Sequence, residues 1–445
     1  MKKFLFTALI SNDLGLFTRS LPIACELRDR GHQVTFCNPA KAPSKVVSDA
    51  GFNNLPIKWN LCNFLSGDFG LFKLSTLYEL FRSRHLKRDL GILVSNMRSA
   101  RLNSTAQYWN VDHAASVGGM GNEDYVRAEV NSWMELIREY NPDAVVDFSN
   151  MGACIAARAS HKPLITVIQA DFHPQSRGFM WWKEPPPDLP TPVPTLNKVL
   201  AELQLNPIHK AAELFVGEIT LVVGMPETDP LPDTANVTYI GPVLWQRSNE
   251  RLPDWFADLS TTKPVIWLYP GNPQYIRGVG TVFDSRVVTH ACIKALKDEP
   301  VQVVLSTGLH PLPKDTLPLP SNFRHASFVP GLAMAERSDL LIHHGGYGSC
   351  QTGLFTGTPT LVIPTYSERE SNARRVAAAG AGDFVLPIAD DVSGRKKHVD
   401  AAEVREKVNR ILSDSSFKEN AKRISEKLRT YGGAPYAASL IEDSV

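Results

Sequence analysis

Short apolar runs and amphipathic stretches alternate along most of the chain. The run Lys3–Ile10 is typical of a buried strand, and Thr18–Arg30 carries apolar residues at the three- and four-residue spacing of a helix. Gly31 ends that helix, and Gln33–Cys37 is the next apolar run. A strand, a helix and a strand in this order form a βαβ unit, which is the building block of a parallel sheet.

A helical, aromatic-rich stretch from Gly51 to Asn141 interrupts this alternation, which then returns. Prolines cluster between Pro185 and Pro194, so we expect a long loop there rather than a helix or a central strand. The elements predicted around this loop are a strand at Ala144–Phe148, a helix at Gly152–Ser160, a strand at Leu164–Gln169 and a last strand at Thr220–Gly224.

The stretch from Pro226 to Thr262 is rich in proline and has few periodic residues, so it reads as a connection. A second alternating series begins after it. Its predicted strands are Val265–Tyr269, 301–305, one ending at Val329, 339–343, 360–363 and 384–386, and its predicted helices are 284–297, 348–355, 370–379, 401–412 and 416–430.

These two series predict an α/β protein of two Rossmann-like, doubly wound domains. A chain of 445 residues is also too long for one ordinary hydrophobic core. The expected boundaries are 1–225 for the first domain, 226–262 for a linker and 263–430 for the second domain. Ligands of doubly wound sheets bind outside the carboxyl ends of the strands, so two such domains facing each other should form a deep cleft.

Composition narrows the class of function. Apolar residues make up 43% and charged residues 21%, which is an ordinary globular balance. The net charge is +1, so no overall attraction to a polyanion exists and nucleic acid is not an expected partner. The six cysteines are scattered, without a CxxC pair or a Cys/His group at zinc-ligand spacing, which favours free thiols in a reducing, cytoplasmic compartment and no bound metal.

The N-terminus needs a separate interpretation. Met1, Lys2 and Lys3 precede a short apolar run, as in a signal peptide, but the run breaks at Ser11 and no small-residue cleavage site follows. A buried first strand explains it better. No apolar run reaches about 18 residues, so we expect no membrane-spanning segment.

The richest chemistry lies between Leu340 and Gly382. An apolar run ends in His343 and His344, a glycine-rich turn follows, and a helix opens near Ser349. Glycines let a ligand approach the backbone, and a helix N-terminus offers free N–H groups with a positive dipole end. With the His344 and Ser349 side chains as further donors, the segment suits a pyrophosphate. The alternative is a tight turn without a ligand.

A second polar tip is expected beside this turn. The chain returns through a strand that ends at Pro364, and Glu368 and Arg369 then precede a helix that contains Asn372. A sugar could lie at this tip, next to the phosphate groups.

Here the sequence resembles the family 1 glycosyltransferases of the GT-B fold. The match is to their donor signature, roughly HGGxGT…GxPxxxxPxxxDQxxNAxR, and it extends over nearly the whole chain, including the helix after the first strand, the strand Pro142–Asp147 and the connection Tyr239–Pro242. The resemblance implies an inverting transfer of a hexose or deoxyhexose from a UDP- or dTDP-sugar to a small, largely apolar acceptor. It implies no cofactor or metal, and a C-terminal segment, 431–445, that crosses back to the first domain.

The resemblance also implies roles for single residues of the second domain. His344 would contact the donor phosphates, and Glu368 with Arg369 replaces the Asp-Gln pair that binds sugar hydroxyls. The other donor positions are Gly346, Gly348 and Ser349 at the phosphates, Gly271 and Asn272 in place of a Gly-Ser turn, Val329 where the backbone meets the base, and Thr352 at the ribose.

The expected catalytic histidine is missing. In the family it follows a glycine of the first loop, which here is Gly15, and Leu16 stands in its place. Asp13 in the same loop is our candidate base, because a carboxylate can take a proton from an alcohol as charge develops. Asp147 matches the aspartate that supports the histidine, and His173 is a further candidate. The alternative for Asp13 is a loop or helix-capping role.

Two donor positions also depart from the family. Thr352 stands where a glutamate often grips both ribose hydroxyls, which permits a deoxyribose donor and leaves UDP and dTDP both open. Arg369 stands where a neutral amide is usual. It could pair with an acidic sugar, since guanidinium matches carboxylate geometry, or form an ion pair with Glu368 or Glu370.

The first domain should hold the acceptor. Its aromatic segments, with Phe172, His173 and Trp181 near or in the proline-rich loop, suit an apolar pocket, although aromatic residues taken singly more often pack in a core. Two other functions stay open. One is a sugar-nucleotide epimerase or hydrolase on the same fold, and the other is a binding protein that has lost catalysis.

Overall fold

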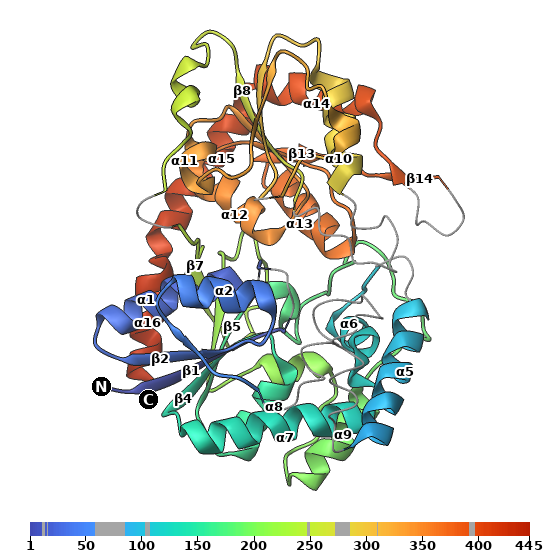
Figure 1. Ribbon diagram of the computed structural model, residues 1–445, viewed down its shortest axis with the longest axis vertical. Helices are drawn as coiled ribbons and strands as arrows, with labels where there is room; N and C mark the ends of the chain where they lie inside the picture. Colours follow the sequence, from blue (N-terminus) through green and yellow to red (C-terminus); the bar gives the residue numbers. More distant parts are fainter. Residues whose placement is uncertain are drawn as a thin grey trace. The chain divides into compact units, whose positions relative to one another are not determined.

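A computed structural model describes the chain except for residues 11–13, 16, 58–84, 103–106, 247–249, 272–284, 309 and 391–396, and the side chains of 96–102. The chain forms two compact units (Figure 1). The N-terminal unit comprises Met1–Asn103, Tyr108–Trp245 and Tyr431–Val445, and the C-terminal unit chiefly Gln246–Thr430. Each unit has its own parallel sheet.

The sheet of the N-terminal unit has seven parallel strands in the order β3-β2-β1-β4-β5-β6-β7. Its strands are almost wholly apolar, because helices cover both faces of a parallel sheet. The chain winds outward from β1 in both directions, so β1 and β4 flank the switch point where ligands of such sheets bind. The strands are β1 (Lys3–Ala8), β2 (Gln33–Cys37), β3 (Asn53–Asn54), β4 (Ala144–Phe148), β5 (Leu164–Ile168), β6 (Ile219–Val223) and β7 (Thr238–Gly241).

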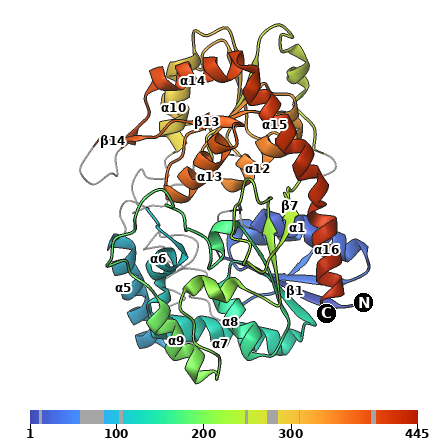
Figure 2. The same ribbon diagram turned by 180° about the vertical axis from the view of Figure 1, so that it is seen from behind.

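The C-terminal segment folds against the first helix of the N-terminal unit. In both views α16 lies beside α1, near the two chain ends (Figures 1 and 2). Arg30 and Glu442 form an ion pair of 2.9 Å, and Lys2 Nζ donates to the Glu442 carbonyl at 2.8 Å. The helices of this unit are α1 (Ser20–Asp29), α2 (Lys41–Asp49), α5 (Leu86–Leu102), α6 (Val111–Ala115), α7 (Glu123–Tyr140), α8 (Met151–Ala159), α9 (Val193–Glu202) and α16 (Gly433–Asp443).

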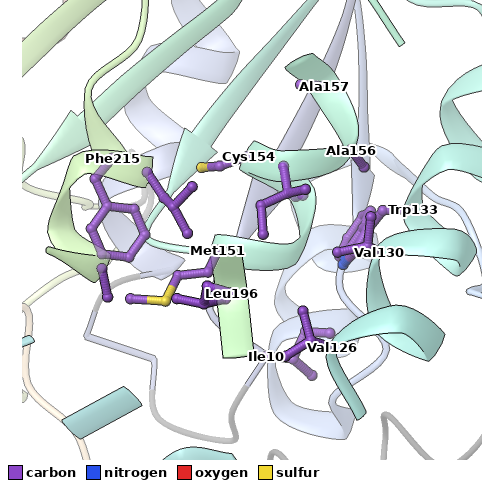
Figure 3. Packing of buried hydrophobic residues seen from close by; sticks show 14 of the residues in the cluster. Ile10, Val126, Val130, Trp133, Met151, Cys154, Ala156, Ala157, Leu196 and Phe215 are labelled. Carbon is purple, nitrogen blue, oxygen red and sulfur yellow. The ribbon is translucent and has the colours of Figure 1, made fainter. Parts of the chain in front are cut away.

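One face of this sheet is buried under α7, α8 and α9. Figure 3 shows Val126, Val130 and Trp133 of α7 turned into the same cluster as Met151 of α8 and Leu196 of α9. The three α7 residues recur at the three- and four-residue spacing that places side chains on one side of a helix. Trp133 is fully buried, and its packing fixes α7 against the sheet.

The sheet of the C-terminal unit has six parallel strands in the order β10-β9-β8-β11-β12-β13. These are β8 (Val265–Tyr269), β9 (Gln302–Ser306), β10 (Phe323–Ala326), β11 (Leu340–His343), β12 (Thr360–Val362) and β13 (Gly382–Phe384), and β14 (Ile388–Ala389) pairs separately with β15 (Lys397–His398). The helices are α10 (Ser285–Leu296), α11 (Gly331–Glu336), α12 (Tyr347–Thr356), α13 (Ser367–Ala378), α14 (Ala401–Ser413) and α15 (Ser415–Leu428).

The predicted fold class, two doubly wound α/β domains, is confirmed. Several local predictions are wrong. The strand predicted at 384–386 is β13, which spans Gly382–Phe384, and the helix predicted at 370–379 begins at Ser367, so Glu368 and Arg369 lie in its first turn. The strand at Thr220–Gly224 is not the last of its sheet, because β7 follows it; β7 has four residues and Pro242 directly after it, so it shows little periodicity. The strand expected to end at Val329 ends at Ala326. Pro194 lies in the first turn of α9, where a proline costs no hydrogen bond.

The described residues contain no candidate membrane-spanning helix, metal-binding cluster or disulfide. No helix there has the length and apolar run needed to cross a membrane. No group of three His, Cys, Asp or Glu side chains is placed to hold a metal ion within the same ranges. The five described cysteines are free, and Cys62 lies outside the described residues.

Candidate functional site

The glycine-rich turn between β11 and α12 is built as an open helix start. Gly346 is the N-cap of α12, and no side chain caps the helix. Gly345, just before it, has φ +89°, which glycine adopts without strain. The α12 N-terminus therefore carries backbone donors and the positive end of a helix dipole, as an anion site requires.

Two buried imidazoles stand at this turn. Burial and the nearby positive charge of Arg369 lower the pKa of His343 to about 3, and they hold the pKa of His344 well below its usual range. Both rings are therefore neutral near pH 7. Among the described residues, His343 Nε2 and His344 Nδ1 are buried without a hydrogen-bond partner. A buried polar atom of this kind calls for an explanation, and for His344 a bound phosphate would supply one.

Glycines make room for the His344 ring. A Cβ atom at Gly271 would lie 2.8 Å from His344 Cγ, and one at Gly346 would lie 2.6 Å from His344 Nε2. Both distances are too short for real contacts, so a side chain at either position would displace the imidazole. Gly271 also has φ +92°, whereas Gly346 has φ −59°, so Gly346 is glycine because of the histidine rather than because of its backbone.

This contact gives a first prediction. Replacing Gly346 by Ala should push the His344 ring out of place and weaken the binding of the expected nucleoside diphosphate, probed with UDP and with dTDP, about tenfold, with little backbone strain. Isothermal titration calorimetry of the purified protein measures this. Gly91→Ala is the control, because a Cβ atom there meets open space in helix α5 of the other unit. Unchanged affinity for both nucleotides in the Gly346 variant would show that the ring position does not matter for binding.

The Gly345 peptide is held from both sides. Its N–H donates to His343 Nδ1 at 3.1 Å, and its carbonyl accepts from Asn372 Nδ2 at 3.0 Å. The Asn372 amide also donates to Glu368 Oε1 at 2.9 Å. The turn and the polar tip that the sequence predicts to lie side by side are thus joined by hydrogen bonds.

At the tip of α13, Arg369 makes contacts other than an ion pair with its neighbours. Its Nη1 atom donates to Thr365 Oγ1 at 2.8 Å, and its guanidinium lies 4.5 Å from the centre of the Tyr366 ring. Glu370 forms its ion pair with Arg374 instead, at 2.7 Å. The alternative in which Arg369 pairs with Glu370 therefore has no support from these contacts.

The remaining predicted donor residues lie in the C-terminal unit, and all but one of them are described by the structure. Ser349 and Thr352 lie on α12, and the Thr352 hydroxyl donates to the Gly348 carbonyl at 2.8 Å. Val329 is buried just before α11, against a cluster that contains Trp267. Asn272 lies outside the described residues.

In the N-terminal unit, Asp147 is fully buried at the end of β4. It accepts from the Thr7 hydroxyl at 2.6 Å, from the Asn150 backbone N–H at 2.9 Å and from Cys154 Sγ at 3.2 Å. Burial raises the pKa of Asp147 to about 6. These contacts join β1, β4 and α8. They indicate that Asp147 stabilises the backbone around the switch point of the sheet rather than contacting a substrate directly.

A second buried acid lies near Asp147 and was not singled out from the sequence. Glu129 of α7 is 4% exposed, and burial raises its pKa to about 7, with a further rise from the Asp147 charge. A Cβ atom at Gly152 would lie 2.7 Å from Glu129 Cγ, so glycine at the start of α8 gives the acid its space. The only sequence signal for a buried acid here is that Glu129 lies between apolar neighbours on the buried side of the predicted helix.

The other predicted residues of this unit are placed as follows. Phe172 packs edge-on against Phe179, with ring centres 5.5 Å apart, so it belongs in part to the core. His173 is buried, its Nδ1 accepts from the Gln175 N–H at 3.2 Å, and burial lowers its pKa. Trp181 is half-buried, beneath the Arg177 guanidinium at 5.7 Å.

The predicted base, Asp13, and the substituted position Leu16 lie outside the described residues. Just before these residues, the Leu9 N–H donates to the Phe148 carbonyl at 3.1 Å. Leu9 therefore lies beside the end of β4, where Asp147 lies.

The sequence of this chain is similar to those of known glycosyltransferases. Residues 297–434, which contain the turn and the α13 tip, match the family described as "Erythromycin biosynthesis protein CIII-like, C-terminal domain". The chain is 26% identical over 333 residues to a PGL/p-HBAD biosynthesis glycosyltransferase of Mycobacterium tuberculosis, covering 68% of this chain and 71% of the relative. It is also 26% identical over 313 residues to the NDP-glycosyltransferase YjiC of Bacillus subtilis, covering 69% and 74%. The chain is a glycosyltransferase of the GT-B, natural-product type.

Solved structures agree on the GT-B fold of this glycosyltransferase. The calicheamicin glycosyltransferase CalG4 matches with a TM-score of 0.69 at 19% identity, over 100% of this chain and 98% of that one. The glycosyltransferase VinC, solved in complex with dTDP, matches with a TM-score of 0.64 at 17% identity, over 99% of both chains. The family expected from the donor signature is confirmed, as is the enzyme class.

Proposed function

We propose that this glycosyltransferase moves a deoxyhexose or hexose from a dTDP- or UDP-sugar to a small, largely apolar acceptor with inversion at the anomeric carbon. The observation that carries the donor part is the β11–α12 turn, where an uncapped helix start, the neutral His344 ring and the Arg369 charge come together. Such a site suits a diphosphate. The dTDP bound by VinC supports a dTDP-sugar as donor.

The proposed reaction is a direct displacement. A carboxylate takes the proton of the acceptor hydroxyl while its oxygen attacks the anomeric carbon, and the bond from that carbon to the phosphate oxygen breaks. The diphosphate leaves with the electron pair. We assign the proton transfer to Asp13, with Asp147 as a support of the same edge of the sheet through its bonds to Thr7 and Asn150.

Thr352 favours dTDP over UDP in this proposal. Its hydroxyl proton is used within α12 by the bond to the Gly348 carbonyl, and one hydroxyl oxygen cannot hold two ribose hydroxyls as a carboxylate does. We therefore predict that Thr352→Glu raises the affinity for UDP about tenfold relative to dTDP. Parallel calorimetric titrations with both nucleotides test this, and an unchanged ratio of the two dissociation constants would argue that position 352 does not face the ribose.

The proposal also covers the acceptor and the compartment. We assign the acceptor to the region of Phe172, His173 and Trp181, because a switch point and aromatic side chains lie in the same unit. The five cysteines in the described ranges are all free, which supports a cytoplasmic location.

The function is tested by mass-spectrometric detection of glycosides. Purified wild type and Asp13→Asn are incubated with UDP- and dTDP-sugars and pooled aromatic and terpenoid acceptors. Product from wild type and little from the variant, at equal nucleotide affinity, is the expected result. Equal product from both would keep the transfer and remove Asp13 as base. Consumption of donor without acceptor would indicate an epimerase or hydrolase, and nucleotide binding without any turnover a binding protein.

A further inference from the structure

We propose that Asn372 is a positioning residue that couples the phosphate-binding turn to the sugar-binding tip, so that this enzyme recognises the two parts of its donor as one unit. The inference rests on the donor site of the proposed function. It concerns a side chain that we expect to touch neither the phosphates nor the sugar.

The amide of Asn372 has two N–H donors, and both are used. One points to the Gly345 carbonyl at 3.0 Å and the other to Glu368 Oε1 at 2.9 Å. Both partners are acceptors only, so the amide nitrogen has to face them and the flipped amide is excluded. Asn372 is 3% exposed, so water cannot readily replace either bond.

The Gly345 end of this link is rigid. Its N–H donates to His343 Nδ1 at 3.1 Å, which places the ring proton of the neutral imidazole on Nε2. Burial lowers the pKa of His343 to about 3, so this bond persists across the neutral range. A Cβ atom at Gly345 would lie 2.8 Å from the Arg369 Cβ atom, so the turn also packs directly on α13. Any shift of Asn372 is therefore transmitted to the peptide that opens α12.

The Glu368 end faces the sugar in the proposed site. Its carboxylate accepts from Asn372 one turn along α13, which fixes one of its oxygens. In the proposed displacement, the acceptor oxygen, the anomeric carbon and the leaving phosphate oxygen have to be aligned. Misplacement of a reacting group by about 1 Å costs about 100-fold in rate. Asn372 sets the separation of the two groups that hold these fragments.

The experiment compares Asn372→Ala, Asn372→Asp, Glu368→Ala and the double variant Asn372→Ala/Glu368→Ala. For each, the dissociation constants of dTDP and of the best dTDP-sugar are measured by calorimetry, with kcat and KM where product forms. We expect both Asn372 variants to keep dTDP affinity within about threefold and to lose the extra affinity for the sugar. We also expect kcat to fall about tenfold. The double variant should be no worse than Glu368→Ala, because a coupled pair is not additive.

Asn322→Ala is the matched control. Asn322 lies in the same unit, and its Nδ2 atom donates to the carbonyls of Leu296 at 2.9 Å and Val301 at 3.2 Å. This variant should lower the melting temperature and leave kcat and both affinities unchanged. If Asn372→Ala behaves like Asn322→Ala, or if its effects add to those of Glu368→Ala, the coupling is overturned. If wild type binds neither dTDP nor a dTDP-sugar, it is the proposed donor site that fails.

Discussion

Replacing Arg369 by Gln should lower kcat about 100-fold with a neutral dTDP-sugar donor and change KM by less than about threefold. The Arg369 charge reaches both His343 and His344, and together with burial it keeps both imidazoles neutral. The turn thus has a permanent cation beside two neutral rings. Removing one preorganised group that stabilises developing charge costs about 100- to 1000-fold in kcat. In the proposed reaction, this developing charge is that of the leaving nucleoside diphosphate.

Steady-state kinetics of three variants test this role. Arg369→Lys should recover part of kcat, because the charge stays while the contact with Thr365 and the Tyr366 ring is lost. Arg374→Gln is the control on the same helix, since it removes the ion pair with Glu370 and the contact over the Phe384 ring but keeps Arg369, and kcat should hold. A loss confined to donors with a carboxylated sugar would instead assign Arg369 to an acidic sugar. Full activity of Arg369→Gln with every donor would remove both roles.

The sequence predicts the strands that lie inside the two sheets and is less reliable at the edges. Gln33–Cys37, Ala144–Phe148 and Val265–Tyr269 are predicted with their observed bounds, because a strand covered on both faces is a continuous apolar run. β7 lies at the edge of its sheet between proline-rich stretches, so it has neither the length nor the pattern of such a run.

The candidate site shows a similar division. The glycine-rich turn and the α13 tip are visible in the sequence, because glycines and polar residues follow apolar runs there. The link through Asn372 is not visible in the sequence. It joins the Gly345 carbonyl to the Glu368 carboxylate, and these two residues are 23 positions apart in the chain. The contacts of Asp147 with Thr7 depend on the pairing of β1 with β4, which no local pattern reveals.

Glu129→Gln should make the protein more stable at pH 8, by an amount on the order of 3 kcal/mol, and change little at pH 4.5. The Glu129 carboxyl has an ordinary pKa of 4.5 and a folded-state pKa of about 7, raised mainly by burial. The folded protein therefore binds this proton more tightly than the unfolded chain. The stabilisation is complete below pH 4.5 and is lost as the pH rises through about 7. Asp147, raised to about 6 by burial, adds a loss of the same sign.

Urea unfolding at pH 4.5 and pH 8, followed by tryptophan fluorescence, measures the difference, because Trp133 is fully buried on α7, one helical turn from Glu129. Glu123→Gln is the control from the same helix. Glu123 is partly exposed, and its hydrogen bonds with Lys198 and Arg127 lower its pKa, so its variant should lose a little stability at pH 8 rather than gain it. If the Glu129→Gln and wild-type profiles run parallel between pH 4.5 and 8, Glu129 does not titrate in this range. A gain at pH 8 alone would mean that the fold keeps a costly buried acid near Asp147, which lies at the end of β4.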